Sequence, residues 1–237
     1  DYSPTDNVLW YLSQTTGHRA GGFNLGYFSA FPSYDSETVE STELGYKGSH
    51  LDNTLQINAS MYHYLYENIH GQFQAQSFLG GTSTSVIPYP EAQTDGFELE
   101  VIYMPQPNWL IGGNYSYTDA RYSKELVDAF GNIGNIDVDN PNAPGSLYTI
   151  KEREVPITNR KMERIPENKM SFYSNYTQEV SGGTIDYLVG FSWTDEILWN
   201  DSGLAMDISP AFTRLDLKAT WKNNEGDMDI MFFINNV

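Results

Sequence analysis

Alternation of apolar and polar residues over long segments is the feature that most constrains this chain. In NTLQINASMYHYLYEN, residues 53–68, every second residue from Leu55 to Leu65 is apolar except at His63. The apolar members are Leu55, Ile57, Ala59, Met61 and Leu65. The segments GTIDYLVGFSW (183–193) and FTRLDLKATW (212–221) repeat the pattern. Successive side chains of a strand point to opposite faces, so this period predicts β-strands and argues against helices.

The length of the alternating segments indicates what kind of β-protein this is. We predict about nine strands, with approximate bounds 7–16, 38–49, 53–68, 93–104, 108–121, 167–179, 183–197, 211–222 and 227–236. Strands of soluble proteins are commonly about 5–6 residues long, whereas a tilted membrane strand needs about 9–11. Strand length therefore favours an all-β fold in the form of an antiparallel transmembrane β-barrel. A soluble β-sandwich is the alternative.

Short and long connections alternate between these strands. The short ones, SHLDN, PQPN, VSGG and KNNEGD, contain the Gly, Pro, Asn or Asp residues that tight turns require. The long ones are predicted loops at residues 17–37, 69–92, 122–166 and 198–210. Outer-membrane barrels have short turns at the periplasmic rim and long loops outside the cell, so we expect the two classes at opposite rims.

Charge and composition exclude several functions. The formal net charge is −18, with 31 acidic residues against 13 basic ones, which disfavours a nucleic-acid partner. The absence of cysteine excludes disulfides and thiolate metal sites. The longest apolar run, Ile230–Ile234, is far shorter than the ~20 residues of a membrane-spanning helix. Several aromatic residues are expected on the lipid-facing side as interfacial girdles, namely Trp109, Tyr115, Tyr176, Tyr187, Trp193 and Trp221.

The order of several short motifs resembles that of a known family. The segment GHRAGGFN (Gly17–Asn24) ends a strand, and Glu37-Thr38 and the run ELGYK (43–47) follow it. LDN (51–53), Asn58 and Tyr62 come next, then DGFELE (95–100) and the tail FFINNV (232–237). Together they resemble the C-terminal half of TonB-dependent outer-membrane receptors. The resemblance covers essentially the whole chain.

The resemblance implies a partial barrel and an import function. Such transporters have 22 strands and a plugged lumen, and 22 strands need roughly 580 residues at this spacing. We therefore expect residues 1–237 to be the C-terminal portion of a larger barrel, without its plug domain and closing strand. The implied protein lies in the outer membrane of a Gram-negative bacterium. Through its plug it takes energy from the TonB–ExbB–ExbD complex and imports a siderophore-iron complex, a corrinoid or an oligosaccharide. A passive porin or adhesin barrel and a soluble carbohydrate-binding β-domain remain as alternatives.

Catalytic and metal-binding motifs have little support in the sequence. The four histidines lack metal-ligand spacing, no Gly-x-Ser-x-Gly elbow is present, and GHRAGGFN is not followed by the helix pattern of a phosphate loop. Asp137, Asp139 and Asn140 lack the rest of a calcium loop. Glu98 and Glu100 point to one face and are expected to line a polar lumen. We predict a protein that is not an enzyme and that needs no cofactor or metal.

Ligand capture by the outer loops is the better-supported function. Two of the predicted loops are rich in aromatic residues with a few polar neighbours, a composition that suits stacking and hydrogen bonding to a small ligand. The predicted ligand-binding residues are His18, Arg19, Tyr27, Phe28, Phe31, Tyr34, Phe73, Phe78 and Tyr89. The alternative is that these aromatic residues pack the loops against one another.

Overall fold

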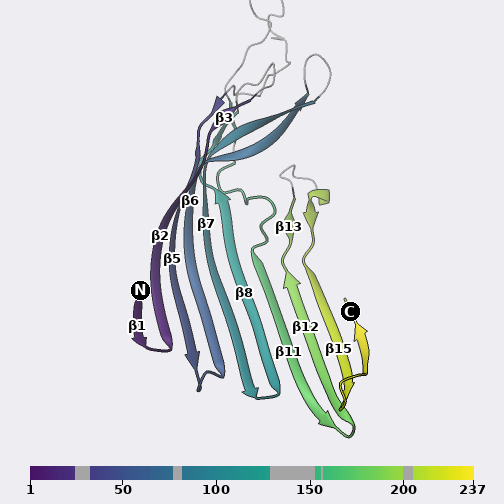
Figure 1. Cartoon of the computed structure of the whole chain (residues 1–237). Helices are drawn as coiled ribbons and strands as arrows, with labels where there is room; N and C mark the ends of the chain where they lie inside the picture. The colour runs from purple at the N-terminus through teal and green to yellow at the C-terminus, as the bar shows by residue number, and fades with distance from the viewer. Residues whose placement is uncertain (25–32, 77–81, 129–152, 156, 200–204) are drawn as a thin grey trace, which may run out of the picture.

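The protein is built around one long, curved sheet (Figure 1). The structure is a computed structural model, and it describes residues 1–24, 33–76, 82–128, 153–155, 157–199 and 205–237. The sheet has ten strands in the order β1-β2-β5-β6-β7-β8-β11-β12-β15-β16. Each strand pairs antiparallel with the sheet strand that precedes it in the chain. The prediction of an antiparallel all-β fold is confirmed.

The elements have the following bounds. The sheet contains β1 (Tyr2–Thr5), β2 (Val8–Arg19), β5 (Glu37–His50), β6 (Leu55–Gln76), β7 (Thr82–Gln106), β8 (Trp109–Tyr122), β11 (Asn168–Val180), β12 (Gly183–Thr194), β15 (Phe212–Asn223) and β16 (Asp229–Ile234). Three short pairs lie in the long connections, namely β3 (Gly22–Phe23) with β4 (Ser33–Tyr34), β9 (Leu126–Asp128) with β10 (Arg153–Val155) and β13 (Ile197–Leu198) with β14 (Ile208–Ser209). One 3-10 turn spans Ala205–Asp207. The described residues contain no helix with the length and hydropathy of a membrane span.

All of the predicted strands are present, but one predicted loop is wrong. Residues 69–92 are not a loop, because β6 continues to Gln76 and β7 begins at Thr82. The two strands pair with each other from Gln76↔Thr82 down to the sheet, and this pairing holds them extended where no other described strand is paired with them. Asn68 has a positive φ of 55°, and the break in regular alternation there hid the continuation from a period-2 search.

The two rims of the sheet separate short turns from long connections, as predicted (Figure 1). At the short-turn rim, the turn after β5 uses three successive residues with positive φ, Leu51, Asp52 and Asn53. At Gly182 and Gly226 the positive φ falls on glycine, which adopts it without steric cost. The long-connection rim carries the hairpin formed by the ends of β6 and β7, which bends across the top of the sheet (Figure 1).

The two faces of the sheet differ in polarity. Ala59 and Met61 of β6 lie on one face, and the partners of Met61 on the neighbouring strands are Leu44 and Phe97. Ser60 lies between them in sequence and points to the opposite face. We call the first side the apolar face and the second the polar face. The alternation in the sequence therefore predicted correctly which side chains share a side.

Large side chains on the apolar face are exposed. Leu12 is 69 % exposed, Met61 54 % and Phe232 71 %, and no large side chain among the described residues is fully buried. A soluble β-sandwich covers its apolar face with a second sheet. A transmembrane barrel presents that face to lipid. A single sheet with one exposed apolar face fits the barrel.

Ionisable residues mark where the apolar face ends toward the long-connection rim. His63, Asp95 and Asp119 are cross-strand partners in one row on that side. The His63 Nδ1 and Asp95 Oδ1 atoms are 2.8 Å apart, and both side chains are at least half exposed. We call the apolar-face residues between the short turns and this row the apolar belt.

Aromatic residues cluster on the apolar face near the short-turn rim. Trp109, Tyr176 and Tyr187 are successive cross-strand partners there. The ring centroids of Trp109 and Tyr176 are 6.1 Å apart, and those of Tyr176 and Tyr187 are 6.4 Å apart. Tyr115 and Trp193 share the same face further up the sheet, as partners of Met170. These residues lie on the predicted face, and Trp109, Tyr176 and Tyr187 lie near one rim, whereas Tyr115 lies in the middle of β8, in the cross-strand row of Ala59. Their interfacial position stays a prediction.

Candidate functional site

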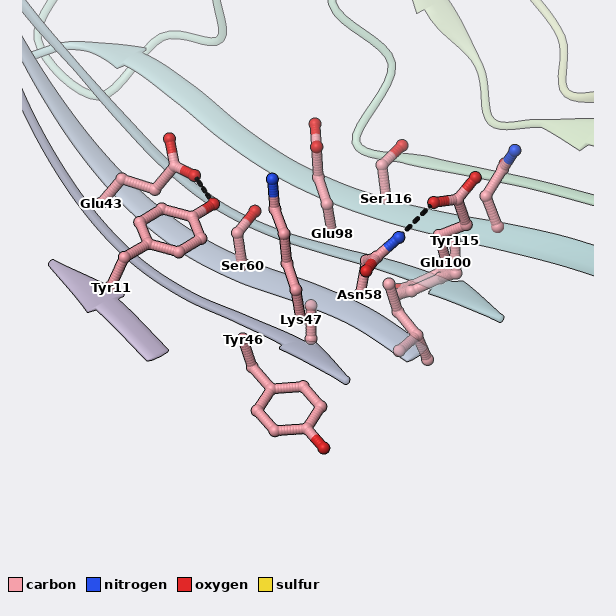
Figure 2. Close-up of a pocket in the computed structure, with 13 residues that line it drawn as sticks. Tyr11, Glu43, Tyr46, Lys47, Asn58, Ser60, Glu98, Glu100, Tyr115 and Ser116 are labelled. Carbon is pink, nitrogen blue, oxygen red and sulfur yellow. Dashed lines mark hydrogen bonds between the residues drawn. The ribbon is translucent and has the colours of Figure 1, made fainter. Parts of the chain in front are cut away.

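The polar face carries a hollow of about 520 Å³ across strands β2, β5, β6, β7 and β8. Two adjacent cross-strand rows line it. One row contains Tyr11, Gly45, Ser60, Glu98 and Ser116, and the other contains Lys47, Asn58, Glu100 and Asn114. Figure 2 shows the polar side chains rising from one side of the strands, while the Tyr46 ring points away from them. Glu98 and Glu100 lie on this face, as predicted.

Two hydrogen bonds hold carboxylates in place in the hollow. The Tyr11 hydroxyl donates to Glu43 Oε1 at 2.5 Å, and Asn58 Nδ2 donates to Glu100 Oε2 at 2.8 Å (Figure 2). The Lys47 Nζ atom lies 5.6 Å from the centroid of the Tyr11 ring, within the range of a cation–π contact. Side chains from four different strands therefore fix one another across the polar face.

The hollow has an excess of acceptors and of negative charge. Its lining contains the carboxylates Glu43, Glu98 and Glu100 against the single ammonium of Lys47. The Asn58 Oδ1 atom is buried and accepts no hydrogen bond from the described residues. Glu98 and Glu100 are exposed, so this surface suits a counterpart that supplies N–H or O–H donors or positive charge.

Tyrosine rings cover glycines on the polar face. A Cβ atom on Gly45 would lie 2.1 Å from Cζ of Tyr11, and one on Gly96 would lie 2.1 Å from Cζ of Tyr62. Each tyrosine is the direct cross-strand partner of its glycine. The Tyr62 hydroxyl lies 3.0 Å from Thr118 Oγ1 on the next strand. The missing side chains let the rings lie close to the backbone.

The structure separates two of the predicted ligand-binding residues, His18 and Arg19. Both belong to β2, where successive residues point to opposite faces. Arg19 shares the polar face with Tyr11, and its guanidinium Nη1 is 3.9 Å from Glu37 Oε2. His18 is exposed on the other side. Only Arg19 of this adjacent pair therefore points toward the polar face.

The glycines of GHRAGGFN act differently from one another. Gly17 stays in β2 and pairs with Val39, so the predicted end of this strand at residue 16 is three residues too early. The strand ends at Arg19. A Cβ atom on Gly21 would lie 2.4 Å from the Tyr34 carbonyl oxygen, so this glycine allows a close approach of two backbone segments. Gly21 therefore fits the prediction that glycines let the backbone leave the strand here, whereas Gly17 is still part of β2.

Tyr34 and Tyr89 both lie against other rings. Tyr34 in β4 meets the His70 ring edge to face, with centroids 4.8 Å apart. Tyr89 belongs to β7 and stacks on Tyr122, with centroids 4.9 Å apart and an angle of 22°. Glu37 and His70 link Arg19 to Tyr34. Glu37 contacts Arg19 and lies 3.8 Å from His70 Nδ1, and the His70 ring contacts Tyr34.

The remaining predicted ligand-binding residues are not placed. Phe73 lies in β6, and nothing is described of its side chain. Tyr27, Phe28, Phe31 and Phe78 lie outside the described residues. Asp137, Asp139 and Asn140, rejected above as a calcium loop, also lie outside them. For these residues the assignment stays a prediction.

The sheet wall contributes residues to the site beyond the predicted Glu98 and Glu100. Tyr11 and Asn58 both face the hollow, and neither is among the predicted ligand-binding residues, which lie in or next to the long connections. The signal was present in the alternation of residues 53–68, which places Asn58 and Tyr62 on the same side. What the sequence lacked was the strand register that brings them beside Glu43 and Glu100.

Comparison with known proteins decides the family. All residues of the chain, 1–237, match the family described as TonB dependent receptor-like, beta-barrel. The chain belongs to this family. A curated relative, the probable TonB-dependent siderophore receptor PiuA of Acinetobacter baumannii, is 25 % identical to it over 130 residues. That match covers 52 % of this chain and 16 % of the relative.

Solved structures of two receptors show the same fold. The ferric yersiniabactin uptake receptor FyuA from Yersinia pestis matches with a TM-score of 0.70 and 15 % identity, over 100 % of this chain and 30 % of that one. The siderophore receptor PiuA from Acinetobacter baumannii matches with a TM-score of 0.68 and 20 % identity, over 99 % of this chain and 30 % of that one. The chain thus spans less than a third of the length of these receptors.

Proposed function

We propose that this chain forms part of the wall of an outer-membrane transporter that imports a ferric siderophore with energy supplied through TonB. The observation that carries the proposal is the two-sided sheet of a TonB-dependent receptor-like barrel. One side is the apolar belt, which suits lipid, and the other holds the polar hollow, which suits a wet or protein-filled lumen. The Gram-negative outer membrane is the location that follows from this proposal.

The cargo is proposed from the relatives and from the chemistry of the long-connection rim. PiuA is described as a probable siderophore receptor, and FyuA as a receptor for ferric yersiniabactin. Arg19 lies at this rim on the polar side, and Tyr34 lies at the same rim against His70. An arginine binds carboxylate or phenolate oxygens, and a tyrosine stacks on flat ligand groups. Corrinoids and oligosaccharides serve as the competing cargo classes in the test below.

A plug domain and TonB are the proposed protein partners. The proposal places the plug N-terminal to this chain and against the polar face. The carboxylates Glu43, Glu98 and Glu100 outnumber Lys47 there, so a plug surface that presents arginine, lysine or backbone N–H groups would complement the hollow. The TonB–ExbB–ExbD complex would then act on the plug and not on the sheet described here.

Energy-dependent uptake by the full-length protein tests the function. Cells that express it as their only siderophore receptor are given radioactive iron bound to catecholate, hydroxamate or phenolate siderophores, with labelled corrinoids and oligosaccharides as competitors. We expect saturable uptake of at least one ferric siderophore, and its loss in a strain without TonB. Uptake that continues without TonB would instead indicate a passive barrel.

A matched pair of substitutions separates ligand recognition from chemistry on the wall. We expect Arg19→Ala to raise the half-saturating concentration of the cargo more than Glu98→Gln does, because Arg19 lies at the long-connection rim and Glu98 lies on the sheet wall in the polar hollow. The cargo is expected to enter chemically unchanged. Recovery of a cleaved product that depends on Glu98 would contradict a purely binding role.

A further inference from the structure

The hairpin at the ends of β6 and β7 extends beyond the rest of the sheet. Pairing of β5 with β6 ends at Thr38↔Glu67, and pairing of β7 with β8 ends at Ala92↔Tyr122. β6 and β7 remain paired with each other as far as Gln76↔Thr82. Beyond the sheet, each strand of this hairpin therefore has one edge to which no other described strand is paired. Such edges leave backbone N–H and C=O groups to be satisfied in another way.

On the β7 edge, the side chain of Asn24 takes the place of a neighbouring strand. Its Oδ1 atom accepts a hydrogen bond from the Val86 N–H at 2.8 Å, and its Nδ2 donates to the Val86 carbonyl oxygen at 2.9 Å. The carboxamide thus makes both bonds that a backbone peptide group would make. Two residues along the strand, on the same edge, Pro88 has no N–H to satisfy.

On the β6 edge, the far end of the same connection makes the contacts. The His70 backbone N–H donates to Glu37 Oε2 at 3.0 Å, and the His70 Nε2 donates to the Asp35 carbonyl oxygen at 2.7 Å. The His70 side chain is only 4 % exposed and lies edge to face against Tyr34. Asn68 Nδ2 donates to the Ser36 carbonyl oxygen at 3.4 Å.

The described residues at the two ends of the connection between β2 and β5, 20–24 and 33–37, are therefore attached to opposite edges of the hairpin. Asn24 attaches the first part to β7, and Asp35, Ser36 and Glu37, the first residue of β5, attach the second part to β6. We call these two described parts and the paired strands of the hairpin one unit. Arg19 and Tyr34, proposed above to contact the cargo, lie at or within this connection.

We propose that Asn24 and His70 are positioning residues that hold this unit in the arrangement that recognises the cargo. The inference rests on the proposed import function and assigns two residues that need not touch the ligand. A connection held in place before binding spares the ligand the cost of ordering it. Loss of either attachment should therefore weaken apparent affinity and leave the rate of transport at saturation unchanged.

The first measurement needs no ligand. In the full-length protein, Asn24→Ala should speed hydrogen exchange at the Val86 amide, because that amide is bonded to Asn24 and not to β6. The amides at positions 85 and 87 point toward β6 and should keep their protection. The matched control is Asn108→Ala at the opposite rim. The Asn108 side chain donates a hydrogen bond to the Thr177 backbone carbonyl oxygen, so this variant also removes an asparagine that bonds to the backbone.

The second measurement is the concentration dependence of ferric siderophore uptake. We expect Asn24→Ala and His70→Ala to raise the half-saturating concentration about threefold to tenfold, with the maximal rate within about twofold of wild type. Asn24→Asp should do no better than alanine, since its carboxylate faces the Val86 carbonyl oxygen. His70→Gln keeps an N–H donor for Asp35 and should restore part of the affinity. Asn108→Ala should leave both quantities unchanged.

Three results would overturn the proposal. The first is unchanged exchange at the Val86 amide in Asn24→Ala, which would show that the attachment is not made. The second is faster exchange there with an unaltered half-saturating concentration. The third is a fall in maximal rate that Asn108→Ala shares, which would indicate general loss of folding. A wild-type protein that imports no siderophore would contradict the proposed function, and the exchange experiment would still decide whether the attachment exists.

Discussion

Separate arginine substitutions at Ala59 and Ser60 test which face of the sheet meets lipid. The two are successive residues of β6, have side chains of similar size and point to opposite faces. Ala59 lies on the apolar face between its cross-strand partners Tyr46 and Leu99. Ser60 lies on the polar face beside Glu98. A difference between the two variants therefore reports the environment of the face and not the length of the new side chain.

The depth of Ala59 in the apolar belt sets the expected magnitude. The belt runs along β6 from Leu55 to the row of His63, and Ala59 lies midway. At ~3.3 Å per residue and a tilt of about 45°, that stretch spans roughly 19 Å across the membrane. An arginine on the lipid face costs about 2–4 kcal/mol at the midplane and about 0–1 kcal/mol near the interfaces. The apolar side has a hollow of about 330 Å³ around Ala59, so overpacking is not the main cost.

Urea unfolding of the full-length protein in lipid vesicles, followed by tryptophan fluorescence, measures the effect. We expect Ala59→Arg to lower the free energy of unfolding by about 2–4 kcal/mol. Ser60→Arg should cost less than about 1 kcal/mol, because its guanidinium faces water and the Glu98 carboxylate. Leu65→Arg, beyond the row of His63, should also cost less than about 1 kcal/mol. The face assignment is refuted if Ser60→Arg costs as much as Ala59→Arg.

Two further predictions concern packing and pH. Gly96→Ala should lower the free energy of unfolding by about 1–3 kcal/mol, since its Cβ would lie 2.1 Å from the Tyr62 ring. The control is Gly190→Ala, whose Cβ meets no atom closer than 3.9 Å, and it should be neutral or stabilise by up to about 1 kcal/mol. Both variants are measured by the same urea unfolding, and an equal loss of unfolding free energy in the two would contradict the prediction. Glu125, beyond the end of β8, accepts hydrogen bonds from the Thr158 hydroxyl and the Ile157 N–H, which hold the pKa of its carboxyl below the ordinary value. The stability that ionised Glu125 contributes is therefore present above the ordinary pKa of about 4.3 and is lost as pH falls through the lowered pKa. Protection of the Ile157 amide from hydrogen exchange should fall in that pH range in wild type. It should not fall there in Glu125→Gln.

The sheet was largely predictable from sequence because its two sides meet different environments. Each strand must alternate to satisfy lipid on one side and polar groups on the other, and that pattern is visible without knowing which strands pair. The extension of β6 and β7 was missed for a different reason. Residues 69–76 still alternate, with Ile69, Phe73 and Ala75 between polar residues, but Asn68 interrupts β6 before this segment. In β7, residues 82–90 show no apolar–polar alternation, and Pro90 interrupts the pairing.

Contacts between distant segments were beyond a reading of the sequence. The bond between Asn24 and Val86 joins residues 62 apart in the chain, and neither neighbourhood has a motif that predicts the other. The hollow on the polar face also depends on contacts between segments that are distant in sequence, because its lining comes from five strands. Local patterns predict which way Tyr11 or Glu98 points. Only the register between strands determines that they lie in one row.

The glycines on the polar face help to fix that register. Tyr11 lies opposite Gly45, and Tyr62 lies opposite Gly96. A slip of two residues would keep every side chain on its own face but would set each ring against a residue with a Cβ atom, where no room exists at that distance. Alternation therefore selects the face, and these glycine–tyrosine pairs select among the registers that alternation alone allows. The first pair also sets Tyr11 within hydrogen-bond distance of Glu43, and the second sets Asn58 beside Glu100, so glycines that first suggest breaks in the strands are part of what assembles the site.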